Sequence, residues 1–363
     1  MWSHTDWGLV IAGVGLSLVG ALLVWSATRH TFGSSYLLKH LVNTGMGLGL
    51  FLWVTRIDHR SLRAWAPWLY AVSVVGLIAV LSPLGSTING SRSWIQLPGG
   101  FSIQPSEFAK IAITVAMAMI FAERRDRDLS PDRRDIALAW LVALVPIGLV
   151  MLQPDLGSAL VLAAMAFGVA AVAGAPKRLL AALLALGVAG VVAAFTTPVL
   201  SAYQRDRLTA FLDPGADPQG IGYQTRQVRI AIGSGGWSGQ GLLSGRQTQG
   251  GFIPFQQTDF VFSVAGEELG FLGSAGLVLL LAFLILRTII VGGRSDAFGQ
   301  LVAVGVALWF AVQAFENIGM NLGIMPVTGL PLPFLSYGGS SMFVGWLALG
   351  LVNNVHLSRV MPR

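Results

Sequence analysis

The chain has 363 residues, of which 54% are hydrophobic and only 11% are charged. A soluble domain carries about a quarter charged residues, so this composition excludes an ordinary soluble protein and indicates a polytopic membrane protein. The net charge is +6 and the isoelectric point is about 10.2, but the basic residues fall between apolar runs, which argues against nucleic acid as a partner. Cysteine is absent, so disulfides and thiolate sites are excluded.

Apolar runs long enough to cross a membrane recur along the whole chain. A helix needs about 20 mostly apolar residues to span the hydrocarbon core. The first run follows Asp6 without a basic leader, which favours a retained span over a cleaved signal peptide. The runs are residues 7–27, 36–55, 65–81, 105–122, 136–152, 156–174, 179–195, 269–291, 298–320 and 340–357. We therefore expect an all-α fold of about ten transmembrane helices, in one domain over residues 1–363.

Basic residues are distributed unevenly between the loops that join these runs. Most lie after the even-numbered runs and at the C-terminus, whereas the other short loops hold little beyond Arg29, Lys39 and Arg92. Because short cytoplasmic loops are enriched in basic residues, both termini are expected in the cytoplasm. The loops after the odd-numbered runs are then extracytoplasmic. They include a large loop, about 196–257, between helices 7 and 8, which is long enough to escape the charge rule.

Polar residues precede the fourth run in the segment SRSWIQLPGGFSIQPSEFAK, residues 91–110. Glu107 in the first helical turn complements the helix dipole, and Lys110 follows on nearly the same face. Lys110 either extends to the outer membrane interface, or it forms an anion subsite with Arg92 in which Glu107 holds the lysine. Trp94 fits either an interfacial aromatic residue or a contact to substrate.

Two further motifs lie in predicted outer loops. Asp155, in the short turn QPDLGS, suits the N-cap of the sixth helix; its alternative role is to orient a cation or an arginine. The glycine-rich run IGSGGWSGQGLLSGRQ, residues 232–247, lacks the residue order of a nucleotide-binding phosphate loop. Nucleotide binding is therefore disfavoured, although the backbone amides of such a loop are able to contact a lipid pyrophosphate.

One carboxylate, Asp259, stands at the boundary between the long loop and the eighth run, beside aromatic residues. Apolar neighbours exclude water and raise the pKa of a carboxyl above about 3.9, towards the range of a general base. The alternative is that Thr258 or Asp259 only caps the helix that begins here. On a continuous helix, Glu267 and Glu268 point about 80° and 180° away from Asp259. At least one of them is expected to be structural, for example by pairing with an arginine of the long loop.

The segment PVTGLPLPFLSYGGSS, residues 326–341, combines three prolines with several glycines. Proline lacks a backbone donor and clashes with the preceding turn, so this segment is expected to be an ordered loop or a broken helix. Such backbone at membrane depth must be buried in protein or line a cavity. Ser336 and Ser340 are its candidate contacts to substrate. Glu316 and Asn317, inside the ninth run, are expected to face the bundle interior as contacts between helices.

Taken in order, these motifs resemble the SEDS family (shape, elongation, division and sporulation), membrane glycosyltransferases that polymerise peptidoglycan from lipid II. The resemblance covers essentially the whole chain. The short N-terminus and the compact C-terminus resemble the RodA-like elongation branch more than the FtsW-like division branch. Relatives often carry P-E-x-H before T-D-F, whereas residues 254–257 here are PFQQ, so roles of that Glu and His cannot be carried over. The motifs are R-x-W-I and Q-P-S-E-x-x-K within 92–110, residues 153–160 and 233–241, T-D-F and E-E-L-G within 258–270, and residues 326–341.

The resemblance implies an active site at the outer face of the bacterial inner membrane. Asp259 would act as general base on the 4-hydroxyl of the acceptor's N-acetylglucosamine, which attacks C1 of the donor's N-acetylmuramic acid with inversion. Arg92 and Lys110 would stabilise the departing undecaprenyl pyrophosphate. Arg205 or Arg207 of the long loop would assist them, and a divalent ion, Mg²⁺ or Mn²⁺, is a further candidate. The implied partners are a class B penicillin-binding protein, which is a transpeptidase, and the elongation machinery.

Two functions of other classes remain open. A lipid II flippase would also use broken helices and an intramembrane Glu316, although the polar motifs cluster on one side and the sequence shows no inverted repeat. A scaffold that only recruits the transpeptidase would not depend on Asp259 at all.

Overall fold

In the computed structural model, which describes residues 4–88, 91–97, 101–125, 130–196, 202–213 and 220–360, the long apolar runs form helices. The elements are α1 Trp7–Phe32, α2 Ser35–Thr55, α3 His59–Leu81, β1 Gly85–Ile88, β2 Ser91–Leu97, β3 Phe101–Ile103, α4 Pro105–Arg125, α5 Arg133–Leu152, α6 Leu156–Ala173, α7 Lys177–Thr196, α8 Ala202–Leu212, α9 Ile221–Ser234, α10 Arg246–Gly250, α11 Val261–Glu268, α12 Gly270–Gly292, α13 Ala297–Leu322 and α14 Gly339–Val360.

The helical, multi-pass membrane fold expected from the sequence is confirmed. In the described part of the chain, eight helices have the length and hydropathy needed to cross a membrane. α7 and α14 coincide with predicted runs but do not belong to those eight, so the count of ten remains a prediction. Between α13 and α14, residues 323–338 contain no helix, as the prolines predicted.

Aspartate side chains define where many of the helices begin. Each accepts a hydrogen bond from a backbone N–H of the first turn, and such a cap stabilises a helix by about 1 kcal/mol. The carboxylate oxygens receive amides at 2.7–3.2 Å, for example Ser158 N on Asp155 Oδ1 at 3.0 Å. The capping residues of α1, α3, α5, α6 and α13 are Asp6, Asp58, Asp132, Asp155 and Asp296.

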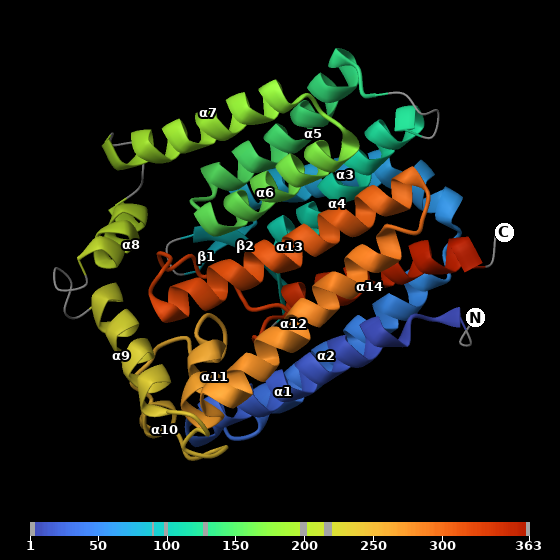
Figure 1. The fold of residues 1–363 in the computed structure, drawn as a ribbon. Coiled ribbons are helices and arrows are strands. Elements are labelled where there is room, and N and C mark those ends of the chain that lie inside the picture. Colours follow the sequence, from blue (N-terminus) through green and yellow to red (C-terminus); the bar gives the residue numbers. More distant parts are fainter. Residues whose placement is uncertain are drawn as a thin grey trace.

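Helix α13 lies at the centre of the bundle, in contact with α4, α6, α12 and α14 (Figure 1). Small residues let it approach its neighbours closely: a Cβ built on Gly305 would lie 2.4 Å from Thr114 Cγ2 of α4. In lipid, helices associate through such close packing rather than through the hydrophobic effect. The middle of α13 is therefore fixed on several sides, and its polar residues near 313–321 are held inside the protein.

The short elements gather at one end of the bundle, opposite both termini (Figure 1). There β1 pairs with β2, with Ser86 opposite Trp94, and β2 pairs with β3, with Ile95 opposite Ile103; both pairings are antiparallel. Neither this sheet nor the helices α8 to α10 were predicted from the sequence. α9 packs against α11 and α13, so part of the predicted long loop is folded onto the membrane helices.

Candidate active site

Asp259 lines a cavity of about 210 Å³ at the end of the bundle that carries the sheet. Four parts of the chain enclose this cavity: the sheet region, the turn before α6, the segment from α8 to α11, and the proline-rich segment before α14. We call it the Asp259 cavity. Its lining residues are Ser91, Ser93, Trp94, Gln104, Pro154, Asp155, Arg207, Phe255, Thr258, Asp259, Thr328, Gly329, Pro331, Tyr337, Gly338 and Ser341.

Two side chains of helix α13 hold the backbone of Asp259 in place. Its carbonyl oxygen accepts hydrogen bonds from Asn317 Nδ2 at 2.9 Å and Asn321 Nδ2 at 3.2 Å. Its own N–H donates to the carbonyl of Phe255 at 3.0 Å, where Phe255 has a left-handed φ of 56°. Both asparagines are fully buried. Asn317 therefore contacts a loop rather than another helix, and Asn321, which sequence reasoning missed, follows it by one helical turn on the same face.

The capping interpretation of Asp259 is wrong, because α11 begins after Phe260 and no side chain caps it. Burial raises the pKa of the Asp259 carboxyl above its ordinary value, while the Thr258 hydrogen bond and the nearby Arg207 partly oppose the increase. Desolvation disfavours the charged form, so it makes the carboxylate a stronger base. This is the electrostatic profile that the sequence predicted for a general base.

Arg207 is the cation that the structure brings to Asp259. Its Nη1 donates to the carbonyl oxygen of Thr328 at 2.9 Å. A Cβ built on Gly329 would lie 3.3 Å from Arg207 Nη2 and 3.6 Å from Asp259 Oδ2, so the two charged groups face the same stretch of backbone. Gly329 has a φ of 74° and leaves this space open. A carboxylate and a guanidinium group thus share one cavity.

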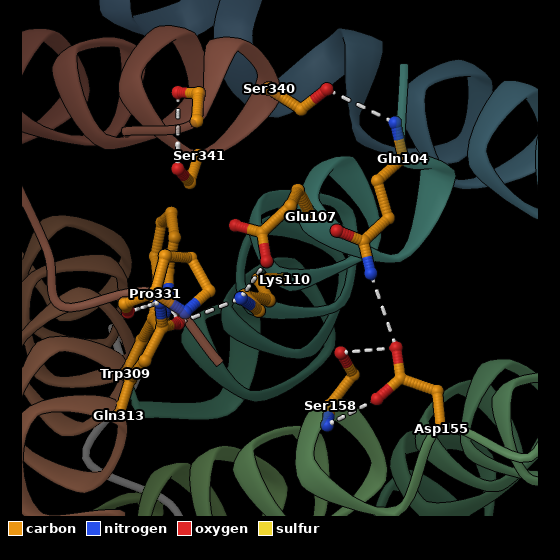
Figure 2. A network of polar contacts seen from close by, with 11 residues as sticks. Gln104, Glu107, Lys110, Asp155, Ser158, Trp309, Gln313, Pro331, Ser340 and Ser341 are labelled. Atoms are coloured by element: carbon orange, nitrogen blue, oxygen red, sulfur yellow. Dashed lines mark hydrogen bonds and ion pairs between the residues drawn. The ribbon is translucent and has the colours of Figure 1, made fainter. Parts of the chain in front are cut away.

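Lys110 is buried rather than extended to the membrane interface, so that interpretation is wrong. Its Nζ donates to Glu107 Oε1 at 2.6 Å and Gln313 Oε1 at 2.8 Å, and lies 5.0 Å from the centre of the Trp309 ring (Figure 2). Glu107 holds the lysine as predicted. Gln313 in turn donates to the carbonyl of Pro331 at 2.7 Å, so this network supports the wall of the Asp259 cavity from behind.

Four other predicted contacts also lie outside the residues that line this cavity. Arg92 is exposed and donates to the carbonyls of Ser82 and Gly85 at 2.7 and 3.2 Å, and Arg205 is exposed on α8. Ser336 Oγ accepts from Leu332 N at 2.8 Å, and Ser340 Oγ accepts from Gln104 N at 3.0 Å. The two serines hold the backbone N–H groups of Leu332 and Gln104 in place, and Arg92 joins the end of α3 to the sheet. Lys110 and Arg92 are not brought together in this cavity.

Asp155 lines the cavity and also caps α6, as predicted. Its Oδ2 accepts from Ser158 Oγ at 2.7 Å and from Gln104 Nε2 at 3.2 Å (Figure 2). No cluster of three or more metal-ligating side chains occurs in the described ranges. Mg²⁺ is commonly held by one or two carboxylates together with substrate phosphates. Asp155 and Asp259 are the carboxylates that line the described cavity, so a divalent ion would need the substrate to complete its ligands.

Glu267 and Glu268 are structural, but they bind backbone amides rather than an arginine among the described residues. Glu267 accepts from Gln247 N and Thr248 N at 2.7 and 2.9 Å. Glu268 accepts from Leu243 N at 3.0 Å and Ser26 Oγ at 2.6 Å. Both carboxylates are buried, and hydrogen bonds to a charged acceptor are the stronger kind. They fasten the end of the glycine-rich segment to the start of the membrane helices.

Two curated relatives resemble the whole chain. Peptidoglycan glycosyltransferase MrdB of Escherichia coli strain K12 is 37% identical over 365 residues, covering 99% of this chain and 95% of MrdB. A probable peptidoglycan glycosyltransferase FtsW of Trichlorobacter lovleyi is also 37% identical, over 362 residues, covering 96% of this chain and 92% of that protein. The two names belong to different branches, so sequence identity alone does not assign this chain to either branch.

Solved structures give the same result. A chain from a peptidoglycan synthase complex that coordinates polymerization and crosslinking superposes with a TM-score of 0.82 at 36% identity, covering 98% of this chain and 99% of that chain. The rod shape determining protein RodA of Thermus thermophilus superposes with a TM-score of 0.73 at 33% identity, covering 99% and 98%. The model of the cell cycle protein family of FtsW, RodA and SpoVE matches residues 7–360. The chain therefore belongs to this family, which is the SEDS family that its motifs resemble.

Proposed function

We propose that the chain is a peptidoglycan glycosyltransferase that polymerises lipid II, with Asp259 as its general base. The observation that carries the proposal is the Asp259 cavity, in which a desolvated carboxylate and the Arg207 guanidinium face the same space. The names of the relatives support the reaction class. The absence of the Glu and His that relatives often carry before T-D-F leaves Asp259 as the base in this segment.

The reaction is one inverting displacement. Asp259 takes the proton of the 4-hydroxyl on the acceptor's N-acetylglucosamine as that oxygen attacks C1 of the donor's N-acetylmuramic acid. The bond from C1 to the pyrophosphate breaks, and undecaprenyl pyrophosphate leaves with the electron pair. Arg207 stabilises the charge that develops on this leaving group in a site of low dielectric constant. No covalent sugar intermediate is needed, so one carboxylate suffices.

The other predicted site residues divide into two groups. Trp94 and Asp155 line the cavity and are proposed to contact the sugars or the pyrophosphate. Glu107, Lys110, Ser336 and Ser340 support its wall through buried hydrogen bonds, so we assign them positioning roles. Arg92 and Arg205 would meet substrate only outside the cavity.

The cellular role that we propose is RodA-like elongation in the bacterial inner membrane, and the alternative is FtsW-like division. The likeness to a rod shape determining protein RodA supports elongation, while a probable FtsW is as similar in identity as MrdB is. The likeness to a chain of a peptidoglycan synthase complex supports a class B penicillin-binding protein as partner, together with the elongation machinery. Both termini are proposed to be cytoplasmic and the Asp259 cavity extracytoplasmic.

The decisive experiment supplies the purified protein with lipid II and measures glycan polymer. A general base contributes about 10² to 10⁴ in rate, so Asp259→Asn is expected to lose that factor while remaining folded. Asp58→Asn is the matched control: it makes the same change at the other end of the bundle and keeps a good cap, so its activity should equal that of the parent. Polymerisation by Asp259→Asn near the parental rate would refute the proposal. Translocation of fluorescent lipid II in liposomes, without polymer, would instead favour a flippase.

A further inference from the structure

A second cavity lies at the end of the bundle that carries the termini. It has a volume of about 290 Å³ and is enclosed by the junction of α2 with α3, the junction of α12 with α13, and the last turns of α14. Arg60, Arg294 and Arg359 each come from a different one of these three segments and line it together. We call this space the arginine cavity. No step of the proposed glycosyl transfer uses it.

The three arginines have no partner of opposite charge within the described chain. All are exposed, and none makes a hydrogen bond through its side chain or an ion pair with another described residue. By contrast, Arg287 forms an ion pair with Asp6, with its Nη2 2.8 Å from Oδ2 of the aspartate. Three guanidinium groups in one cavity repel one another, and a bound anion would reduce this repulsion.

The two carboxylates that line the arginine cavity are already engaged. Asp58 Oδ1 accepts the backbone N–H of Arg60 at 2.9 Å and caps α3. Asp296 caps α13 through Gly299 N at 3.0 Å and pairs with His59 Nε2 at 3.3 Å. These caps orient both aspartates towards the helix ends, so the cationic side chains are the groups available to a ligand.

We propose that the arginine cavity binds a phosphate-bearing anion. Arginine binds phosphate through paired N–H donors in a planar fork, which distinguishes it from a simple point charge. The cavity lies at the ends of membrane-spanning helices, where lipid headgroups are the most abundant phosphates, and basic pockets between such helices bind anionic headgroups. This position favours an anionic phospholipid headgroup, such as phosphatidylglycerol, over a free phosphate as the source.

The test measures lipid bound to the full-length protein by native mass spectrometry from detergent. The protein is titrated in parallel with phosphatidylglycerol, phosphatidylcholine, inorganic phosphate and a hexaglutamate peptide. The test variant replaces the cavity arginines by glutamine: Arg60→Gln, Arg294→Gln and Arg359→Gln. The control variant removes the same charge from arginines that lie outside the cavity on α5 and α7: Arg133→Gln, Arg134→Gln and Arg178→Gln. Thermal unfolding of both variants checks that they are folded.

The expected result is a preference of the parent for phosphatidylglycerol over phosphatidylcholine that the test variant loses and the control variant keeps. One arginine near a membrane surface raises the affinity for an anionic lipid about fivefold. The triple substitution should therefore weaken phosphatidylglycerol binding by well over tenfold. Binding of inorganic phosphate that depends on the same arginines would support a soluble phosphate as the source. Equal phosphatidylglycerol binding by test variant and parent would overturn the proposal, as would arginine-dependent binding of hexaglutamate alone, which would indicate an acidic protein partner.

Discussion

At the scale of single residues, the proposed mechanism requires an Asp259 carboxyl whose pKa is raised but which is still ionised at the working pH. Burial raises its pKa, and Thr258 and Arg207 act in the opposite direction. A general base works best when its pKa lies close to the working pH. Arg207 therefore has two roles in the proposed mechanism: it stabilises the leaving group, and it keeps Asp259 ionised at a lower pH than burial alone would allow.

Replacement of Arg207 separates these two roles. The base must be ionised, so activity is lost as the pH falls through the pKa of Asp259. Arg207→Gln removes a positive charge that lowers this pKa, so the acid limb of the pH–rate profile should move to higher pH, and the maximum rate should fall. The measurement is polymerisation of lipid II between about pH 4 and 9. Arg205→Gln, two positions away and outside the cavity, should leave the acid limb unchanged; an equal shift in both variants would contradict the assignment.

At the scale of elements, the glycine-rich segment is a folded connection rather than a flexible loop. Gly239 has a φ of 81° and Gly270 a φ of 67°, and the two backbones pack together where α11 meets α12. Gln240 N and Gly241 N donate to the carbonyls of Glu267 and Glu268 at 2.9 and 3.1 Å. The same glutamates bind the next turns of the segment through their side chains, so this connection and α11 form one unit.

Two glycines of this region should respond differently to alanine. A Cβ on Gly239 would lie 2.2 Å from the carbonyl oxygen of Glu268, and its left-handed backbone costs an L-residue about 1–2 kcal/mol before that clash. Gly233, in the last turns of α9, has no atom within 4 Å of such a Cβ, and alanine favours a helix by about 1 kcal/mol. Thermal unfolding should therefore show Gly239→Ala clearly destabilised and Gly233→Ala unchanged or slightly stabilised. Similar unfolding temperatures would show that the connection does not contribute to stability.

The sequence allowed the long helices to be predicted because each needs only a run of apolar residues, with boundaries marked by Pro105 or by a cap such as Asp155. The three-stranded sheet and α8 to α10 escaped prediction because they lie in polar segments without a clear period. Asp259 itself was visible as a charge at an apolar boundary. Asn321 was not, because its bond to the Asp259 carbonyl joins residues 62 positions apart, and a single sequence carries no signal for such a pairing.

At the scale of the whole molecule, the two ends of the bundle differ in composition and in structure. The sheet and α8 to α11 lie at the end of the bundle opposite the termini (Figure 1). The residues that line the arginine cavity lie at the end with the termini, and those that line the Asp259 cavity lie at the opposite end. The proposed orientation places the first end in the cytoplasm, in accord with the enrichment of cytoplasmic loops in basic residues. Lipid II would then be polymerised at the outer leaflet.

The absence of cysteine allows this orientation to be tested with one thiol at a time. Ser238→Cys places an exposed thiol in the glycine-rich segment, and Arg133→Cys places one at the start of α5. A maleimide that cannot cross the membrane should label Ser238→Cys in spheroplasts, and Arg133→Cys only after the membrane is permeabilised. The reverse pattern would invert the topology and place the Asp259 cavity in the cytoplasm.

The central helix α13 has a mechanical consequence. Its first residues follow Asp296 at the arginine cavity, and its last turns carry Asn317 and Asn321, which hold the Asp259 carbonyl. A helix of 26 residues is about 39 Å long and transmits axial displacement because every turn is hydrogen-bonded to the next. A shift of α13 along its axis would therefore carry the asparagines, and with them the base, towards or away from a bound sugar. The helix thereby connects the arginine cavity to the residues that hold the backbone of Asp259.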